Sequence, residues 1–435
     1  MRKISDITTL GFALFAMFFG AGNLLLPPLI GLAAGQYWGL AISGFGLTGI
    51  LLPFLGVLSV VNSGETFEDL AGRVHRTVAL VLGAVIMLGI GPLIAIPRTA
   101  ATTYEVGLLP TFPSLSPIWG SVLFFVVTYV LSIRPSKVVD VIGNFLTPVL
   151  LVLLLTLIII GILYPVSDPG TGTGTPVAAF TSGFTEGYQT LDVLASVIFA
   201  GIIITAARMK GYTSLKEKNQ IVISAGLMAA IFLLLIYGGL VILGATSGYS
   251  TGNDIKRAEL LLFISNKILG GYGTIAISLS IALACLTTAI ALTCAVGTFF
   301  STLFKNKISY EVIVTICCLL SGILSITGVE YIIEVAYPFL AFIYPIVITL
   351  VLYVIIFGKK ISSKLPYIGA VAGTTLVSTV YLLAGLGIHL AGAERLVHAI
   401  PLAEYELWWV LPSFIFFLLF WLIDRFKTKT TKDTV

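Results

Sequence analysis

The chain has 435 residues, of which 58% are hydrophobic and only 10% are charged, and its mean hydropathy is +1.07. Because an ordinary soluble domain carries about 25% charged residues, this composition excludes a soluble globular protein. The formal net charge is +4. The Lys and Arg residues are placed in alternate connecting segments, as described below, so the charge does not indicate a nucleic-acid partner.

Apolar segments recur along the whole chain, and each is long enough to cross a hydrocarbon core roughly 30 Å thick as a helix. They predict an all-α integral membrane protein with about twelve spans. In chain order these lie at residues 5–33, 36–61, 77–104, 117–133, 138–164, 188–210, 219–245, 272–304, 308–327, 330–357, 366–390 and 406–424. No connecting segment is long and apolar enough to form a separate core, so we expect a single membrane domain.

Lysine and arginine residues gather in alternate connecting segments. By the positive-inside rule these segments are cytoplasmic, which predicts cytoplasmic positions for both termini. The basic residues on the opposite side are Lys256, Arg257, Lys267 and Arg395, and Arg98 lies within a span.

Two of the segments expected outside have distinctive compositions. Residues 165–187 are rich in glycine and threonine and are expected to form a flexible connector. Residues 251–269 mix charged with apolar residues, which predicts an amphipathic helix over the outer vestibule. Such a helix is either a lid or an interfacial helix without a gating role.

Two spans carry signals for an interruption. In the first, Gly20-Ala21-Gly22-Asn23 precedes Pro27-Pro28, and glycine removes steric restraint while proline removes hydrogen-bond donors, so a break is expected near residues 20–23. The sixth span contains Gly201 near its middle. This second signal is weaker, because isolated glycines also allow membrane helices to pack closely, as is expected of Gly31, Gly35 and Gly39.

The two interrupted spans begin two five-span halves, at residues 1–165 and 186–358, which are followed by an appended pair at 362–426. An odd number of spans gives the halves opposite orientations. Interrupted helices at corresponding positions of inverted halves mark a transporter's binding site near the bilayer midplane. The residues expected to bind substrate are therefore Ala21, Gly22, Asn23, Phe199, Ala200, Gly201 and Ile202.

Other function classes have less support. An intramembrane enzyme needs a nucleophile, a metal or an acid–base pair within the spans. The histidines show no metal-ligand spacing and lie in or beside loops: His75, His389 and His398. The cysteines are expected to be small buried hydrophobic residues: Cys285, Cys294, Cys317 and Cys318. We predict no catalytic residue, no enzymatic activity and no cofactor. A channel has no need of interrupted helices in inverted halves.

Four segments resemble the bacterial branched-chain amino acid carrier family: residues 18–28 (FFGAGNLLLPP), 91–107 (GPLIAIPRTAATTYEVG), 188–195 (YQTLDVLA) and 284–292 (ACLTTAIAL). The resemblance covers nearly the whole chain. It implies a leucine-transporter-type fold of five plus five inverted spans with alternating access. It further implies import of leucine, isoleucine and valine across the bacterial cytoplasmic membrane by sodium symport. A proton-coupled carrier of the same or other neutral amino acids is the alternative.

The resemblance also implies a sodium site between the first and eighth spans. The segment Ala284-Cys285-Leu286-Thr287-Thr288 is similar to one that supplies a carbonyl and two adjacent hydroxyl groups to sodium in leucine-transporter-type proteins. The match of the first span adds the carbonyl groups of Ala16 and Phe19. Alternatively, each threonine bonds a carbonyl of its own helix one turn back.

Arg98 is the one basic residue deep within a span. An unpaired charge at that depth is expensive, and the acids at comparable depth are Asp192 and Glu334. We predict an outer gate in which Arg98 pairs with one of them. The alternative is a static role, with Arg98 snorkelling or holding backbone carbonyl groups.

The substrate site itself needs few special side chains. The aliphatic substrate tail needs only an apolar pocket, and the amide and carbonyl groups exposed by a broken helix can bind the two charges of a zwitterion without a buried charged side chain.

Overall fold

The computed structural model describes residues 2–172, 174–249 and 257–432, and no strand occurs among them. The first five spans comprise α1 (Arg2–Phe18), α2 (Ala21–Ala34), η1 (Gly35–Tyr37), α3 (Trp38–Gly46), η2 (Leu47–Leu51), α4 (Leu52–Ser63), α5 (Phe67–Ala71), α6 (Arg76–Leu88), η3 (Gly89–Leu93), α7 (Ala95–Thr102), η4 (Thr103–Leu108), α8 (Pro117–Ser132), α9 (Pro135–Val141), η5 (Ile142–Leu146) and α10 (Thr147–Leu163).

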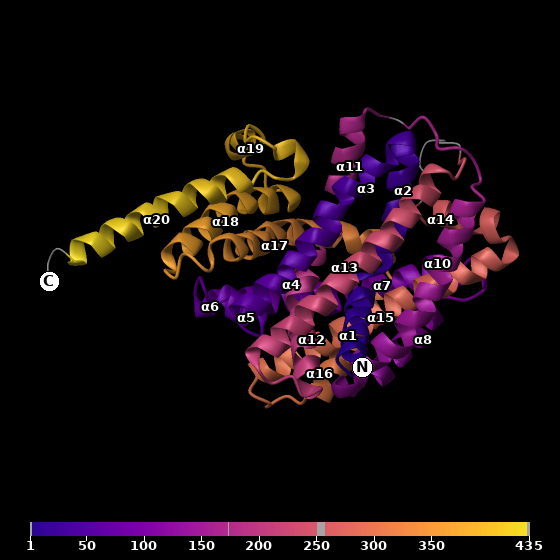
Figure 1. The fold of residues 1–435 in the computed structure, drawn as a ribbon, viewed down its shortest axis with the longest axis horizontal. Helices are drawn as coiled ribbons and strands as arrows, with labels where there is room; N and C mark the ends of the chain where they lie inside the picture. The colour runs from indigo at the N-terminus through magenta and orange to yellow at the C-terminus, as the bar shows by residue number, and fades with distance from the viewer. Residues whose placement is uncertain (1, 173, 250–256, 433–435) are drawn as a thin grey trace.

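The second half of the chain is also helical. It comprises α11 (Pro176–Gln189), α12 (Asp192–Met209), α13 (Leu215–Ala245), α14 (Arg257–Leu269), α15 (Gly271–Leu303), α16 (Tyr310–Ser325), α17 (Val329–Phe357), α18 (Leu365–Gly385), α19 (Ala391–His398), η6 (Ala403–Tyr405) and α20 (Val410–Lys432). Figure 1 shows α1 and α12 within the bundle, while α18 and α20 extend from one side of it beside α17.

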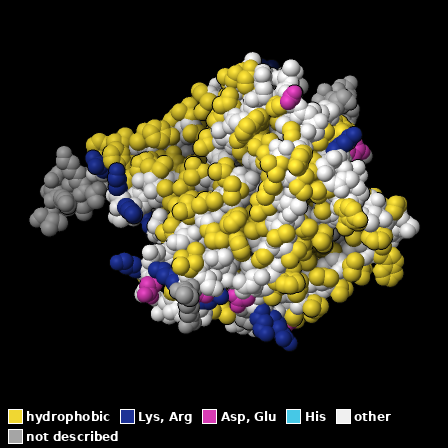
Figure 2. Space-filling view, turned by 45° about the vertical axis from the view of Figure 1, so that its right-hand side comes forward, with side chains coloured by type: hydrophobic (Ala, Val, Ile, Leu, Met, Phe, Trp, Pro, Cys, Tyr) yellow, Lys and Arg dark blue, Asp and Glu magenta, His cyan; other side chains and the backbone are white. Residues whose placement is uncertain are grey.

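The all-α membrane architecture is confirmed. Over the described residues, eight helical stretches are long and apolar enough to cross a membrane, and the shorter helices α8 and α16 are also apolar. Figure 2 shows hydrophobic side chains spread over a broad central area of the surface, with Lys and Arg mainly along its lower and left margins. The hydrophobic surface is that expected of a protein whose solvent is lipid.

The predicted break in the first span is confirmed. Helix α1 ends at Phe18 and α2 begins at Ala21, with Gly20 in an extended conformation (φ −94°, ψ −173°). A side chain at Gly20 would meet the hydroxyl group of Thr288 at 3.4 Å. This is an ordinary van der Waals distance, which places the broken backbone beside α15 without excluding a small side chain.

The break predicted at Gly201 is wrong. Helix α12 runs without interruption through Phe199, Ala200, Gly201 and Ile202. A Cβ atom at Gly201 would lie 3.3 Å from the backbone oxygen of Glu65, so this glycine lets the loop between α4 and α5 pass close to the helix. It is a packing glycine, the alternative that the sequence left open.

The sixth span is instead broken at residues 190–191, between α11 and α12. Leu191 has a left-handed backbone (φ 61°, ψ 19°), a conformation that ends the helix before it. The preceding helix α11 occupies residues 176–189. The prediction of a flexible connector is therefore wrong for residues 176–187. Its start has recognisable signals, because Pro176 is its first residue and the side chain of Thr175 accepts a hydrogen bond from the amide of Ala178.

The third span contains a further interruption that the sequence analysis did not predict. Between α6 and α7 the backbone leaves helical geometry at Gly91 (φ −88°, ψ −122°) and Ile94 (φ −132°, ψ −68°), on either side of Pro92. A Cβ atom at Gly91 would lie 2.5 Å from the side chain of Val296 on α15. Close contact with α15 therefore accompanies the kink.

The predicted amphipathic helix is confirmed for residues 257–269, which form α14, while residues 251–256 lie outside the described residues. Its position over the outer vestibule stays a prediction. Its apolar face is fully buried at Leu260, Leu261 and Ile264. A role as a lid stays a prediction.

Candidate functional site

A small central cavity of about 70 Å³ lies where the interruptions at residues 19–20, 91–94 and 190–191 meet. Its lining residues come from α1, α2, the third span, α12, α15 and α17. They are Met17, Phe18, Gly20, Asn23, Gly89, Ile90, Ile94, Ala95, Arg98, Thr99, Thr190, Leu191, Asp192, Ala195, Thr288, Leu292 and Leu340. Interrupted helices expose backbone groups, so such a cavity suits a polar ligand inside a membrane.

One wall of the central cavity is polar and is organised by Asn23. Its side-chain amide donates hydrogen bonds to Asp192 Oδ2 (2.6 Å), the Tyr237 hydroxyl (2.7 Å) and the Phe18 carbonyl oxygen (3.1 Å). Asn23 is 4% exposed and Asp192 8% exposed. The amide therefore ties the broken first span to the start of α12 and to α13. The sequence analysis missed Tyr237, because a tyrosine in an apolar span carries no signal of its partner.

Arg98 lines the same cavity from α7 and is half-buried. Its guanidinium lies 3.8 Å from where a Cβ atom of Gly22 would stand, beside the first turn of α2. Of the two acids predicted to pair with Arg98, the structure brings Asp192 to the cavity, whereas Glu334 is exposed on α17 and does not line it. A gating role for these residues stays a prediction.

Apart from the threonines Thr99, Thr190 and Thr288, the other side chains that line the central cavity are mostly apolar. Phe18, Ile90, Ile94, Leu292 and Leu340 contribute to its lining. A hydrophobic wall opposite a few fixed polar groups is the usual composition of a small-molecule site.

The predicted substrate residues on α12 lie elsewhere. Phe199 is fully buried behind the cavity wall, with its ring 5.7 Å from that of Phe18, and Ala200 is also fully buried. Gly201 and Ile202 line a second, larger cavity. Among residues 199–202, none belongs to the central cavity lining, because the break lies eight or more residues earlier than the sequence indicated. A substrate contact for these residues stays a prediction.

The residues predicted to bind sodium do come together, between the C-terminal end of α1 and the middle of α15. The Thr287 hydroxyl lies 3.1 Å from the Ala16 carbonyl oxygen and 3.0 Å from that of Ala284. The Thr288 hydroxyl lies 3.4 Å from the Ala16 oxygen and 3.3 Å from that of Met17. Thr287 thus also bonds its own helix, the alternative role considered for it.

This cluster gathers neutral oxygen atoms at the negative end of the α1 dipole, an arrangement suited to a hard monovalent cation. The Met17 carbonyl group is an additional member that the sequence analysis missed. Phe19 is fully buried in the break, with its amide bonded to the Phe15 carbonyl oxygen. A sodium contact from the Phe19 carbonyl group stays a prediction. No group of three or more His, Cys, Asp or Glu residues within the described ranges is placed to hold a metal ion.

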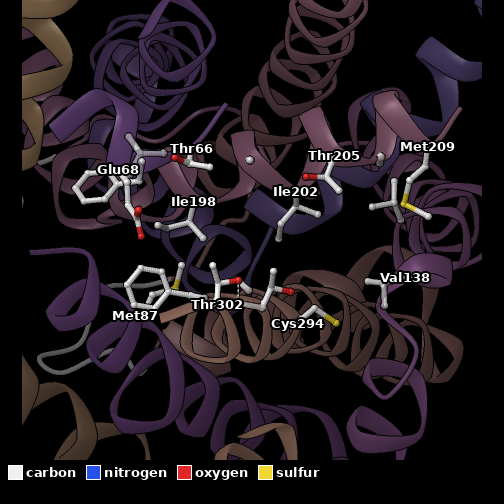
Figure 3. A pocket seen from close by; sticks show the side chains of 18 of the residues that line it. Thr66, Glu68, Met87, Val138, Ile198, Ile202, Thr205, Met209, Cys294 and Thr302 are labelled. Carbon is white, nitrogen blue, oxygen red and sulfur yellow. Dashed lines mark hydrogen bonds between the residues drawn. The ribbon is translucent and has the colours of Figure 1, made fainter. Parts of the chain in front are cut away.

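The second cavity, of about 420 Å³, is lined in part by Lys210, whose ammonium group lies 3.6 Å from Asp6 near the start of α1. Figure 3 shows Ile198, Ile202 and Thr205 of α12 facing Cys294 and Thr302 of α15 across it. The central cavity is lined one turn earlier on the same two helices, by Ala195 and Leu292. The two cavities therefore follow one another along α12 and α15.

Charged residues join the elements around the larger cavity. Glu65, in the loop after α4, accepts hydrogen bonds from Lys218 of α13 and from Arg208 of α12 (2.8 Å to Arg208). Lys210 of α12 lies 2.9 Å from Asp140 and 3.6 Å from Asp6. These ion pairs hold α12 against α1, α9 and the loop after α4.

The Glu65 cluster predicts a pH-dependent contribution to stability. The hydrogen bond from Lys218, together with attraction to Lys218 and Arg208, lowers the pKa of the Glu65 carboxyl below its ordinary value of 4.5. A carboxyl whose pKa is lowered on folding stabilises the protein above its unfolded pKa, and this contribution is lost as the pH falls through the folded pKa. We expect Glu65→Gln to remove about 1 kcal/mol of stability at pH 7, because it leaves the Lys218 ammonium, on a residue 3% exposed, without its carboxylate, while water screens a Glu65 side chain that is 39% exposed.

Thermal unfolding of the purified protein between pH 7 and pH 3.5 checks this expectation. The variant should lose less stability than the wild type as the pH falls, while Glu68→Gln, a change at an exposed residue of α5, should behave like the wild type. Parallel pH profiles for wild type and Glu65→Gln would contradict the assignment.

Comparisons with known proteins extend the structural findings. The sequence model of the family described as "Branched-chain amino acid transport protein" matches residues 3–427. The branched-chain amino acid permease BraB of Bacillus subtilis (strain 168) is 37% identical over 420 residues, which are 95% of this chain and 94% of that protein. BrnQ, a branched-chain amino acid permease of the same strain, is 33% identical over 439 residues, which are 99% of this chain and 100% of that protein.

Two solved structures share the fold at low sequence identity. Mhp1, a nucleobase-cation-symport-1 family transporter, has a TM-score of 0.58 at 12% identity, with 92% of this chain and 96% of that chain covered. A sodium-coupled sialic acid symporter has a TM-score of 0.57 at 15% identity, with 95% and 90% covered. The predicted leucine-transporter-type fold is confirmed by this similarity.

Proposed function

The chain belongs to the branched-chain amino acid transport protein family, and from this premise we propose that it imports leucine, isoleucine and valine by sodium-coupled symport with alternating access. The central cavity is the proposed substrate site. Its apolar wall of Phe18, Ile90, Ile94, Leu292 and Leu340 suits a branched aliphatic side chain. The backbone amides of the first turn of α2, at residues 21–23, follow the break and have no side-chain cap, so they suit the substrate carboxylate.

The observation that carries sodium coupling is the oxygen cluster beside this cavity. Thr288 belongs both to the cavity lining and to the cluster at the end of α1. A sodium ion held there would fix the end of α1 against α15. Because the same break in the first span lines the central cavity, occupancy of one site is expected to favour occupancy of the other.

The proposed membrane is the bacterial cytoplasmic membrane, with both termini in the cytoplasm, as the distribution of Lys and Arg predicts. In this orientation the larger cavity lies on the cytoplasmic side and forms the release path. The division into a first half at 1–165, an inverted half at 186–358 and an appended pair at 362–426 stays part of the proposal.

Proton coupling is the second candidate, and one observation favours it. Asp192 places a carboxyl group at the central cavity, where a proton carrier needs a group that can gain and lose a proton. The sequence by itself indicates no such group near the sodium site.

Uptake of radiolabelled leucine into proteoliposomes, with sodium and proton gradients imposed separately, tests the proposal. We expect concentrative uptake driven by an inward sodium gradient and abolished when that gradient is dissipated. Uptake driven by a proton gradient alone would replace sodium coupling with the second candidate. Absence of leucine uptake under both gradients would contradict the proposed function.

Filling the space between α2 and α7 is expected to block the substrate site. Gly22→Leu places a side chain beside the Arg98 guanidinium and the first turn of α2, so leucine binding should weaken by about 100-fold or more, since overpacking costs up to about 3 kcal/mol. Binding of radiolabelled leucine to purified protein measures the change. Gly39→Leu is the matched control, because a Cβ atom at Gly39 of α3 would meet no heavy atom within 4 Å. Equal affinities in the two variants would place the site elsewhere.

A further inference from the structure

The central cavity contains groups of opposite charge, which the sequence analysis did not anticipate for the substrate site. Asp192 opens α12 and is 8% exposed, whereas Arg98 enters from α7 on the third span. Both side chains line the cavity, together with Phe18 and Leu340. The sequence alone predicts that backbone dipoles meet the charges of a zwitterion. The kink at residues 91–94 precedes α7, and Arg98 of α7 lines the cavity together with residues from the breaks in the first and sixth spans.

The surroundings of the two charges differ. Asp192 accepts a hydrogen bond from Asn23 at 2.6 Å, which holds one carboxylate oxygen in place. The Arg98 guanidinium lies beside Gly22, in the first turn of α2, where helix amides also favour an anion. The cavity thus has a fixed negative group at the break of the sixth span and a positive region at the break of the first.

A site of this kind selects for net charge. Arg98 and Asp192 lie in one low-dielectric cavity and attract one another, so together they add no net charge to it. An amine would bring an unmatched positive charge into the cavity and a carboxylate an unmatched negative one, and either loses much of its binding energy through desolvation. A zwitterion matches both Arg98 and Asp192. Sites built around such polar contacts reject analogues that lack one of the groups much more strongly than apolar pockets reject a missing methylene.

We propose that Asp192 and Arg98 are substrate-binding residues, with the Asp192 carboxylate receiving the α-ammonium group and the Arg98 guanidinium receiving the α-carboxylate. This inference rests on the proposed function, since it concerns the amino acid bound at the same cavity. Asn23 is a positioning residue that holds Asp192. A structural role for Asp192, as the residue that fixes the break before α12, predicts instead that its loss weakens all ligands alike.

The test compares three ligands on purified wild-type protein and variants by competition with radiolabelled leucine. The ligands are leucine, 4-methylpentanoate, which lacks the ammonium group, and 3-methylbutylamine, which lacks the carboxylate. In the wild type, both analogues should bind at least about 100-fold more weakly than leucine. Asp192→Asn should weaken leucine binding by about 10- to 100-fold. It should leave the affinity for 4-methylpentanoate unchanged or raise it, so that the preference for leucine over 4-methylpentanoate largely disappears. Arg98→Gln should do the same for leucine against 3-methylbutylamine.

Two further variants complete the design. Asp192→Glu keeps the charge and should retain the preference for leucine. Asp168→Asn makes the same chemical change as Asp192→Asn, but at a residue after α10 that lies outside the cavity lining. It should bind every ligand like the wild type. Equal weakening of leucine and 4-methylpentanoate in Asp192→Asn, or unchanged leucine binding, would overturn the assignment. If Asp192→Asn does not fold, the ligand preference of Arg98→Gln decides. Failure of the proposed function looks different, because then the wild type itself does not bind leucine.

Discussion

Replacing Thr287 and Thr288 together by valine is expected to abolish the response of leucine uptake to sodium. Valine keeps the shape of threonine but removes the hydroxyl groups that lie 3.0 to 3.4 Å from the carbonyl oxygens of Ala16, Met17 and Ala284. Each hydrogen-bonding or ion-binding contact to a charged group contributes about 1.5 to 3 kcal/mol. Each single variant should therefore raise the sodium concentration for half-maximal uptake by about 10- to 100-fold, and the double variant by more.

Sodium titration of leucine uptake into proteoliposomes measures this effect. Thr293→Val is the matched control, because Thr293 is a fully buried threonine of the same helix α15 and does not belong to the lining of the central cavity. Its sodium response should equal that of the wild type. If the double variant transports leucine with an unchanged sodium response, the oxygen cluster has only a structural role and proton coupling becomes the leading mechanism.

The second large effect is expected at Gly31, where α2 packs against α13. A Cβ atom there would lie 1.9 Å from the backbone carbonyl oxygen of Val241, far inside van der Waals contact. Neither backbone can yield without moving a whole helix, so Gly31→Ala should destabilise the protein by about 3 kcal/mol or more. Leucine binding should fall as well, because α2 also carries Asn23.

Thermal unfolding of detergent-purified protein and leucine binding measure the two consequences of this substitution. Gly39→Ala, at a glycine with nothing within 4 Å of its Cβ position, should lower neither. The sequence alone groups Gly31 and Gly39 together as packing glycines. A melting temperature for Gly31→Ala equal to that of Gly39→Ala would show that α2 and α13 are not held at this distance in the membrane.

The sequence determined the membrane architecture, because the length and hydropathy of each span suffice for that inference. It also predicted a break near residues 20–23, which the structure places at residues 19–20, because an asparagine beside glycines in an apolar segment needs the polar partners that an interrupted helix exposes. The pairing of Thr287 with Ala16 followed from the resemblance of two segments, and the structure brings these residues together.

Only the tertiary structure decided where the sixth span breaks and which charges meet at the cavity. Gly201 and Leu191 show why. A glycine is compatible with either a helix break or a close packing contact. At Gly201 the packing partner is the Glu65 backbone, which is distant in sequence, while the break lies at Leu191. Asp192 rather than Glu334 joins Arg98 because the break at residues 190–191 opens α12 at the cavity. Local propensity records which conformations a segment tolerates, whereas the contacts that choose among them come from helices far along the chain.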